Sequence, residues 1–460
     1  MRVAENTEWV QQQFESCEFG DKRRTKRVCR MAMNMLECPD KSLPTQSDTW
    51  SDVKAAYRWC ARDQVTFDAV ATPHWEQTRA TKPGRYLLIS DTTDIDHSSH
   101  RATGGLSRLG KGIGCGMQLH SCLMVDAKDK LVLGTAGALL HYRSKVPKNE
   151  SRTARLKRHR ESQIWGDVVD QVGEPPKGSQ WIHVFDRGGD NFEALCHIVL
   201  NGGDWIIRAA KLNRNVLDAA GNTLSLGDAL DDADVVGSYE LSLRARPGQA
   251  ARVAQIEVST CTVRFPRPHF CSKFVKTCGI DSIEMNVLIV QEVGAAKGVT
   301  PIRWVLLTNL PVDSFEAAWE IIEFYECRWL IEEYHKVLKT GCQMERHALR
   351  EASRLEPLTA LISVIGVRLL QLKTIGRHDP QQRAQHRVPS RWLDALKALR
   401  PRLKKIQLTV YEFFRELAKL GGFLGRKHDG EPGWQTTWRG YQKLHNILLG
   451  MELANQQKCG

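Results

Sequence analysis

The sequence contains no long uninterrupted apolar run. The longest candidate, Leu358 to Leu372, is broken by Ser363 and Arg368, whereas a membrane span needs about 18 or more predominantly apolar residues in a row. Residues 1–5 lead directly into polar sequence, without the apolar core of a signal peptide. We therefore expect no membrane partner and a cytoplasmic protein.

Cysteine pairs of the metal-binding type are also missing. The 13 cysteines are scattered from Cys17 to Cys459, and no two of them form a Cys-x2-Cys pair. In an intracellular chain this pattern is typical of free thiols rather than of a disulfide framework. One group has zinc-binding residue types, but its spacing fits no standard structural zinc site, so its role stays open. The group consists of Cys261, His269, Cys271 and Cys278.

Repeats and low-complexity tracts are absent as well, which argues against a solenoid or a disordered chain. With 42% hydrophobic and 26% charged residues, the composition is that of a folded protein. At roughly 100–200 residues per domain, 460 residues predict two to four domains.

Positive charge is in excess. Lys and Arg number 65 and Asp and Glu 53, which leaves +12 and favours nucleic acid as a partner. The cations cluster at residues 22–30, 143–160 and 383–405, and Glu150 is the single acid in the second cluster. One such cluster alone is often a solvated helix face, but three in one chain favour phosphate contact. The first cluster supplies candidate DNA contacts: Arg23, Arg24 and Arg27.

Hydrophobic periodicity predicts a mixed α/β sheet between helical ends. We expect helices in the first 70 residues, three strands followed by helix, strand, helix and strand up to residue 207, and a β-rich insertion at about 213–301. A strand at 304–308 and a long helix from Asp313 or Ser314 to Thr340 follow, with Gly341 as its stop. The expected helices are 9–14, 21–36, 50–60, 153–172 and 191–200, and the expected strands are 86–89, 117–125, 131–139, 181–185, 205–207, 238–243, 251–265 and 285–293. The expected domains are 1–70, 71–355 and 356–460.

Two carboxylates stand where apolar strands are expected to end. Asp91 follows the first strand of the sheet and Asp186 the fourth. Buried parallel strands deliver such side chains to the carboxyl edge of the sheet, where hard cations such as Mg²⁺ can be shared. An Asp after a strand can also be a turn or cap residue, and Asp94, Asp96 and Asp190 stay open as further ligands.

The long helix carries chemistry on one face. At about 100° per residue, one phenol, three cations and one carboxylate fall within about an 80° arc. These are Tyr325, Arg328, Glu332, Lys336 and Lys339. The opposite face is apolar and comprises Leu330, Ile331, Tyr334, Val337 and Leu338. A solvated face with i,i+4 charge pairs is the alternative interpretation.

Carboxylates and cations together suit phosphodiester cleavage. In-line cleavage uses two metal ions about 3.5–4 Å apart, and three carboxylates can hold them. Arg and Lys can bind the flanking phosphates, Arg in a bidentate manner and Lys as a point charge.

The spacing Tyr325-x2-Arg328-x3-Glu332-x6-Lys339 resembles the signature of bacterial cut-and-paste DDE transposases of the insertion-sequence-four family, nearest the transposon-five type. Further similar segments occur in the same order over nearly the whole chain. They are residues 20–25 (GDKRRT), 56–59 (AYRW), 91–93 (DTT), 186–190 (DRGGD), 304–308 (WVLLT), 328–341 and 420–423 (LGGF).

The resemblance implies an RNase H-like catalytic core, a DNA-binding N-terminal domain and a C-terminal dimerisation domain. It implies that Asp91, Asp186 and Glu332 hold two Mg²⁺ ions, for which Mn²⁺ can substitute. It also implies DNA contacts by Tyr325, Arg328, Lys336 and Lys339, a base-stacking role for Trp304 after base flipping, and further contacts by Arg208 and Lys211. Trp304 can equally be a core residue of its strand.

The implied activity is cleavage of double-stranded transposon-end DNA through a hairpin intermediate, followed by joining of the 3′ ends to target DNA. A homodimer at the bacterial nucleoid is implied, with Phe423, Trp434 and Trp438 either on the protein–protein surface or in an ordinary core. Gly188-Gly189 departs from the family pattern and could loosen the Asp186 loop. Two alternatives stay open: a metal-dependent nuclease without strand transfer, and a catalytically silent DNA-binding regulator.

Overall fold

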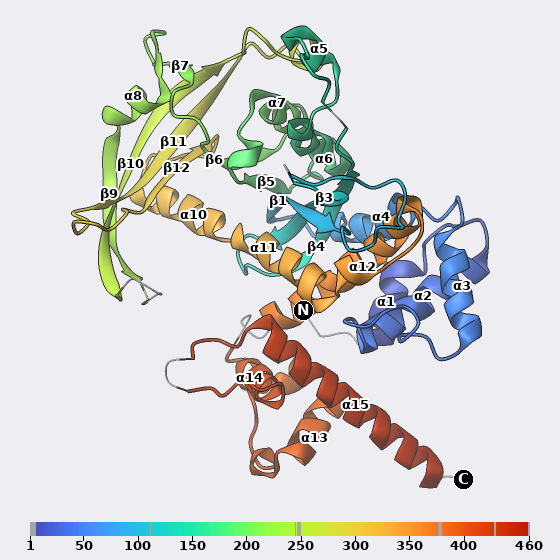
Figure 1. Cartoon of the computed structure of the whole chain (residues 1–460). Coiled ribbons are helices and arrows are strands. Elements are labelled where there is room, and N and C mark those ends of the chain that lie inside the picture. Colours follow the sequence, from blue (N-terminus) through green and yellow to red (C-terminus); the bar gives the residue numbers. More distant parts are fainter. Residues whose placement is uncertain are drawn as a thin grey trace.

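A single curved sheet organises the chain in the computed structural model, which describes residues 6–110, 112–144, 146–243, 245, 250–375, 380–426 and 429–458 (Figure 1). Its 12 strands run in the order β2-β3-β1-β5-β6-β12-β11-β10-β7-β8, with β4 added beside β3 and β9 beside β10. The strands are β1 Arg85–Asp96, β2 Ser107–Arg108, β3 Cys115–Asp126, β4 Val132–His141, β5 Gln180–Phe185, β6 Asp204–Arg208, β7 Asn215–Leu217, β8 Thr223–Ser225, β9 Asp234–Leu243, β10 Arg252–Pro266, β11 Ser282–Val293 and β12 Arg303–Thr308.

The central strands mix two directions. β1, β5 and β6 are parallel neighbours. On one side of them, β3 is antiparallel to β1 and β4 is antiparallel to β3; on the other side, β12 is antiparallel to β6. The mixed α/β sheet is therefore confirmed, and the strands within the segment expected to be β-rich, β7 to β11, extend the same sheet.

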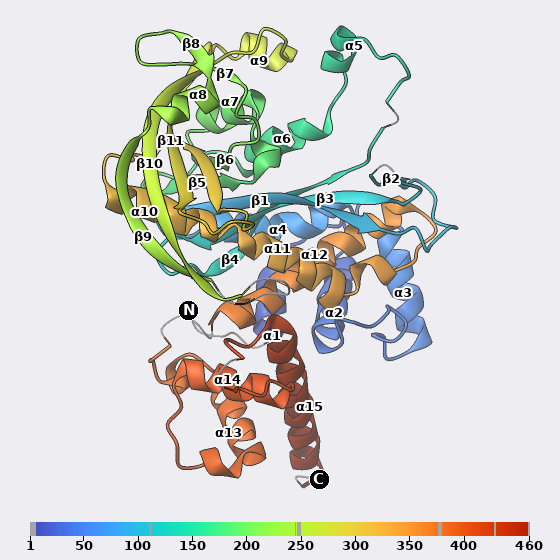
Figure 2. The same ribbon diagram turned by 60° about the vertical axis from the view of Figure 1, so that its left-hand side comes forward.

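Helices cover both faces of the central strands. In Figure 2, α6 (Ile164–Val172) and α7 (Phe192–Leu200) lie above the sheet, and α4 (Phe67–Arg79) and α12 (Ala352–Ile375) lie below it. Apolar side chains from both layers form the core, because a sheet buried on two faces needs hydrophobic partners on each.

The N-terminal helices follow the predictions. They are α1 (Asn6–Phe14), α2 (Lys22–Glu37) and α3 (Trp50–Cys60), and Asp21 caps α2 by accepting a hydrogen bond from the Arg23 amide. Two expected domain boundaries fall inside helices, because residue 70 lies in α4 and residue 356 in α12.

The helix α12 runs through the middle of the molecule. By length and composition alone, Ala352–Leu372 could cross a membrane, but 94% of the apolar 18-residue window within it is buried inside the protein. This is what a central core helix looks like, and Arg368 within it is also buried.

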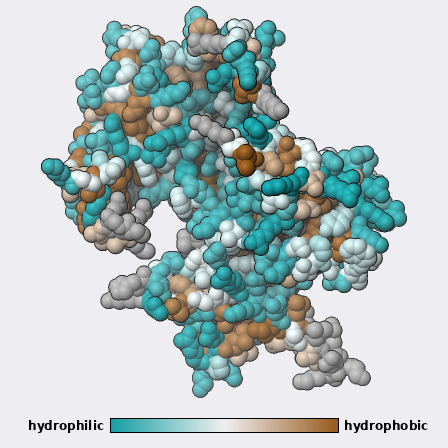
Figure 3. Space-filling view, in the orientation of Figure 1, coloured by the Kyte–Doolittle hydropathy of each residue, from teal (hydrophilic) through white to brown (hydrophobic). Residues whose placement is uncertain are grey.

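The C-terminal helices pack into a separate layer. They are α13 (Ser390–Leu399), α14 (Val410–Leu420) and α15 (Trp434–Lys458). Trp434 and Trp438 are 7% and 6% exposed, so they belong to the chain's own core rather than to its surface. Figure 3 shows hydrophobic areas on the surface of the lower part of the molecule. Exposed apolar side chains of the C-terminal region are Leu399, Ile406, Leu424, Leu449 and Met451.

Three predicted elements have different bounds. β1 does not end before Asp91 but continues to Asp96, because β3 pairs with it along its whole length. The helix expected at 153–172 is divided into α5 (Arg152–Lys157), a 3₁₀ turn and α6, since Arg158 and Arg160 are extended. Short helices α8 (Leu226–Asp231) and α9 (Lys273–Thr277) interrupt the insertion.

The long helix expected from Ser314 is also divided. Ser314 caps α10 (Phe315–Glu326), which is followed by α11 (Trp329–Lys336) and a π turn, Val337–Gly341. At the junction, the Arg328 amide bonds the Tyr325 carbonyl at 3.0 Å, an i to i+3 bond of the 3₁₀ type. Such a turn rotates the chain by about 120° per residue, so the single helical wheel does not hold across it.

Candidate active site

Asp91 lies where β1 loses one of its two neighbours. Pairing with β5 ends at Ser90 opposite Phe185, while pairing with β3 continues through Asp91 opposite Ser121. Asp186 follows β5 directly. Neighbouring strands are about 4.8 Å apart, so the two carboxylates are brought to the same edge of the sheet.

The environment of Asp91 disfavours its charge. Burial raises its pKa to about 6, and Asp186 adds to the effect, as does Glu332 more weakly. The Thr92 amide and Arg328 act in the opposite direction. Repulsion between neighbouring carboxylates is what a bound cation would relieve.

Asp186 is held in a tight turn. Its Oδ1 accepts a hydrogen bond from the Gly188 amide at 2.7 Å. A β-carbon at Gly188 would lie 2.7 Å from the Trp165 ring, and one at Gly189 would lie 2.5 Å from the Phe185 ring. The two glycines therefore permit close packing of this loop, contrary to the expectation that they loosen it.

Glu332 on α11 reaches the same region through Arg328. The Arg328 guanidinium donates to Glu332 Oε1 at 2.6 Å and lies 3.9 Å from Asp91 Oδ2. The structure thus brings Asp91 close to Asp186, but Arg328 stands between Asp91 and Glu332. Among the described residues, no three His, Cys, Asp or Glu side chains form a group that could hold a metal ion as they stand.

Tyr325 is buried, with 3% of it exposed, rather than placed on the outer face of a long helix. Its hydroxyl has no hydrogen-bond partner of ordinary geometry in the part of the chain that the structure describes. Burial raises the pKa of Tyr325, and the cations Arg328 and Arg208 oppose that rise. A buried O–H donor between two guanidinium groups is a suitable receptor for a phosphate oxygen.

Trp304 on β12 lies beside this receptor. Its ring meets that of Tyr325 edge to face, with centroids 5.4 Å apart. Arg208, at the end of β6, donates to the carbonyl of Arg303 at 3.3 Å, and Lys211 is exposed just beyond β6.

The two lysines of the motif separate. Lys336 is exposed at the end of α11, whereas Lys339 in the π turn lies 3.5 Å from Glu345. The apolar side of the motif is buried as predicted, with Ile331 and Tyr334 both fully enclosed.

The other nearby acids are engaged elsewhere. Asp190 is buried against Arg214, and Asp94 accepts a hydrogen bond from Gln118 at 2.9 Å. Asp96 accepts from the Ser98 amide.

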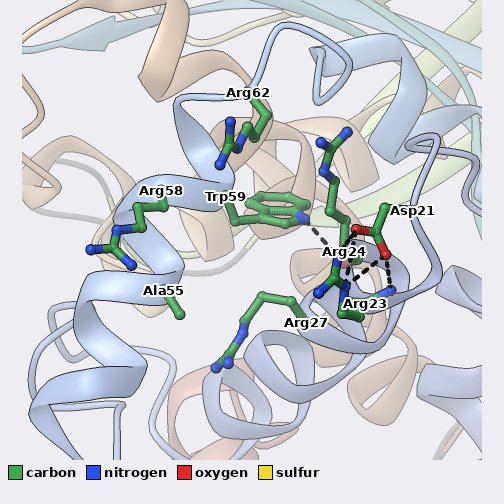
Figure 4. Close-up of a pocket in the computed structure, with 8 residues that line it drawn as sticks. All are labelled: Asp21, Arg23, Arg24, Arg27, Ala55, Arg58, Trp59 and Arg62. Carbon is green, nitrogen blue, oxygen red and sulfur yellow. Dashed lines mark hydrogen bonds and ion pairs between the residues drawn. The ribbon is translucent and has the colours of Figure 1, made fainter.

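A second feature is a cleft in the N-terminal domain, of about 390 Å³. Figure 4 shows guanidinium groups from α2 and from the end of α3 arranged around Trp59. Its lining residues are Asp21, Arg23, Arg24, Arg27, Ala55, Arg58, Trp59 and Arg62. Arg58, in the last turn of α3, and Arg62, just beyond the helix, were absent from the predicted contacts.

The predicted arginines of this cleft are partly paired. Arg23 is 89% exposed beside Asp21, and Arg27 forms an ion pair with Asp52 at 2.9 Å. Arg24 donates to Gln64 at 3.0 Å. The cleft keeps a large excess of positive charge and is therefore a suitable phosphate-binding surface.

The cysteine group singled out in the sequence does not assemble as a zinc site within the described residues. Cys271 and Cys278 instead approach Cys196 on α7, and burial together with these thiols raises the pKa of Cys196.

Comparison with known families identifies both ends of the chain. Residues 6–65 match the family model described as "Transposase DNA-binding", and residues 364–458 match the one described as "Transposase Tn5 dimerisation domain". The class of protein that these matches support is a DNA transposase that binds DNA and forms a homodimer. Within that class, the second match supports a transposase similar to that of Tn5.

Proposed function

We propose that this chain is a cut-and-paste DDE transposase of the insertion-sequence-four family. It binds transposon-end DNA, cleaves it by metal-dependent hydrolysis and joins the 3′ ends to target DNA at the bacterial nucleoid. The observation that carries the proposal is the pair Asp91 and Asp186 at one edge of the sheet, with Arg328 contacting both Asp91 and Glu332. The segment that holds these residues lies between two regions that match transposase family models.

The strand order supports an RNase H-like core. Strands β4, β3 and β1 are antiparallel neighbours, and β5 and β6 continue from β1 in parallel. The β-rich insertion lies between the strand that leads to Asp186 and the helix that carries Glu332, as the family resemblance implies.

The donor set fits divalent cations. Asp91 and Asp186 offer carboxylate oxygens, which Mg²⁺ and Mn²⁺ prefer. Glu332 would complete the site if its ion pair with Arg328 were broken and its carboxylate bound the metal instead. When bound, such ions activate water and stabilise the leaving oxygen.

The chain's own residues would position the DNA. Once released from Glu332, Arg328 can bind a phosphate in a bidentate manner, and the Tyr325 hydroxyl can donate to the same group. Lys336 and Lys339 add positive charge along α11 and the π turn. Trp304 would stack a base flipped out during hairpin formation.

The ends of the chain would supply binding and assembly. The arginine cleft of α2 and α3 would hold the terminal repeat, and the C-terminal helices would pair two subunits, as the two family matches support.

Cleavage of a supercoiled plasmid that carries the element's terminal repeats, with Mg²⁺ present, tests the proposal. We expect Glu332→Gln to lower cleavage at the repeat ends at least 100-fold while DNA binding is retained. The matched control is Glu323→Gln, which changes an exposed carboxylate on α10 and should cleave normally.

Joining of a pre-cleaved end to a second plasmid separates the alternatives. Cleavage without any joined product would favour a nuclease. A protein that binds DNA but neither cleaves nor joins it would favour a silent regulator. In that case DNA binding would be its only measurable activity, and Glu332→Gln would leave that activity unchanged.

A further inference from the structure

Residues 142–144 and 146–163 belong to an arm that projects from the body of the molecule and carries α5 (Figures 1 and 2). In the described part of the arm, most side chains are exposed. It is the second of the three basic clusters in the sequence, and neither family match includes it.

The arm begins beside the acidic site. It leaves β4 after His141, which pairs with Gln118 on β3, and Gln118 is three residues from Ser121, the partner of Asp91. At about 3.4 Å per residue, the base of the arm is about 10 Å from Asp91 along the strand direction.

The arm also returns beside that site. It ends at the first turn of α6, where the Trp165 ring lies against Gly188 in the Asp186 turn. The Trp165 ring also packs against Phe185 at 4.9 Å and against His120 at 4.7 Å between ring centroids. His120 in turn bonds Thr92, next to Asp91, at 2.7 Å. The two ends of the arm therefore flank the two aspartates.

Acidic partners hold the base of the arm. Arg143 pairs with Glu161 at 2.7 Å, and Arg160 pairs with the buried Glu193 at 2.7 Å. Within the arm, Glu150 pairs with Arg158. Both acidic residues of the arm, Glu150 and Glu161, are therefore already in ion pairs.

The outer cations are left without such partners. Lys148, Arg155 and Lys157 are exposed, and none of them forms an ion pair with another described residue. Lys145 and the Arg152 side chain lie outside the described residues. The hydrogen bond from Arg158 lowers the pKa of Glu150, and the charge of Arg155 also helps to lower it, but Glu150 itself is paired with Arg158. Exposed cations in excess of acids on an overhanging segment match a polyanion rather than a mixed-charge protein surface.

We propose that this arm binds the backbone of the transposon-end duplex next to the scissile phosphate. The inference rests on the proposed function, because it takes the aspartate edge as the place of cleavage. The site is distinct from the arginine cleft, because Figure 2 shows α5 above the central strands and α2 and α3 below them. One duplex would thus be held on two sides of the sheet edge.

Binding of metal-free protein to a duplex carrying the terminal repeat, measured over a range of salt concentrations, tests the arm. Affinity falls as salt rises, and the slope of log affinity against log salt concentration reports the number of phosphates contacted. We expect the triple variant Lys148→Ala, Arg155→Ala, Lys157→Ala to reduce the magnitude of this slope by about 2–3. Hydroxyl-radical footprints should lose protection at the cleavage position and keep it over the inner part of the repeat.

The control triple, Lys82→Ala, Lys177→Ala, Lys297→Ala, removes the same charge from exposed positions outside the arm. An arm variant whose salt slope and footprint equal those of this control would overturn the inference. The inference would also be overturned if the arm variant cleaved the ends normally and failed only in joining, because the arm would then bind target DNA. If the wild-type protein does not prefer the repeat over unrelated DNA, the proposed function itself fails.

Discussion

Asp91 lies in an environment that differs from that of an ordinary surface acid. Its pKa is raised from 3.8 to about 6 by burial and by Asp186. An acid with a raised pKa in the folded state binds its proton more tightly there than in the unfolded chain. Ionisation of Asp91 therefore lowers the free energy of unfolding. The full loss is present above about pH 6, and none of it is present below about pH 4.

Asp91→Asn should consequently stabilise the metal-free protein at pH 8 by about 2–3 kcal/mol, and the gain should vanish near pH 4. Urea unfolding at several pH values measures this. Asp63→Asn, at an exposed position, should change stability little at any pH. Added Mg²⁺ should stabilise the wild type more than the variant, and equal stabilisation of both would argue against metal binding at Asp91.

Gly189 is a residue where any side chain must displace its surroundings. A β-carbon there would lie 2.5 Å from the Phe185 ring. Gly189→Ala should lower the free energy of unfolding by about 1–3 kcal/mol through overpacking, and it should reduce DNA cleavage because Asp186 moves with the turn. Gly433→Ala, with open space around it, should leave both unchanged. A Gly189→Ala protein as stable as the wild type would show that the turn can relax.

At the scale of elements, the break between α10 and α11 decides how the motif is used. The 3₁₀ turn at Arg328 takes Tyr325 into the interior and leaves Glu332 at the edge, paired with Arg328, so the motif residues do not line one stripe. Local i,i+3 and i,i+4 bonding alternatives differ little in energy, so packing selects between them.

Glu193 couples three elements. It accepts hydrogen bonds from Arg160 at the base of the arm, from Gln163 and from Ser272 next to α9. Glu193→Ala should leave these donors unpaired and loosen the arm, so trypsin should cut faster within residues 148–158. The time course of native-state proteolysis, followed by mass spectrometry, measures this. Glu174→Ala, an exposed acid, is the control, and equal cleavage rates would mean that the arm is held by other contacts.

At the scale of the whole molecule, the first helix, α1, contacts the last helix, α15. The Tyr441 hydroxyl on α15 donates to Asn6 on α1 at 2.8 Å, and both residues are buried. Arg368 of α12 lies 5.7 Å from the Trp9 ring in the same region. The DNA-binding and dimerisation regions therefore share one core.

Tyr441→Phe should lower the free energy of unfolding by about 1 kcal/mol, because the Asn6 carbonyl oxygen loses its donor in a buried place. Tyr411→Phe is the matched control, since that hydroxyl bonds Glu431 at an exposed site. Urea denaturation of both variants gives the comparison. A smaller loss for Tyr441→Phe than for Tyr411→Phe would show that water replaces the buried bond.

Most helices and strands could be predicted from local sequence, because caps such as Asp21 and Ser314 and the apolar periodicity act through near neighbours. The sequence also placed acidic residues after apolar strands and cations in clusters. Tertiary structure alone decided that Arg328 stands between Asp91 and Glu332, that Tyr325 is buried, and that the arm flanks the aspartates. Such contacts join residues far apart in the chain, and they depend on how layers pack rather than on local conformational preference.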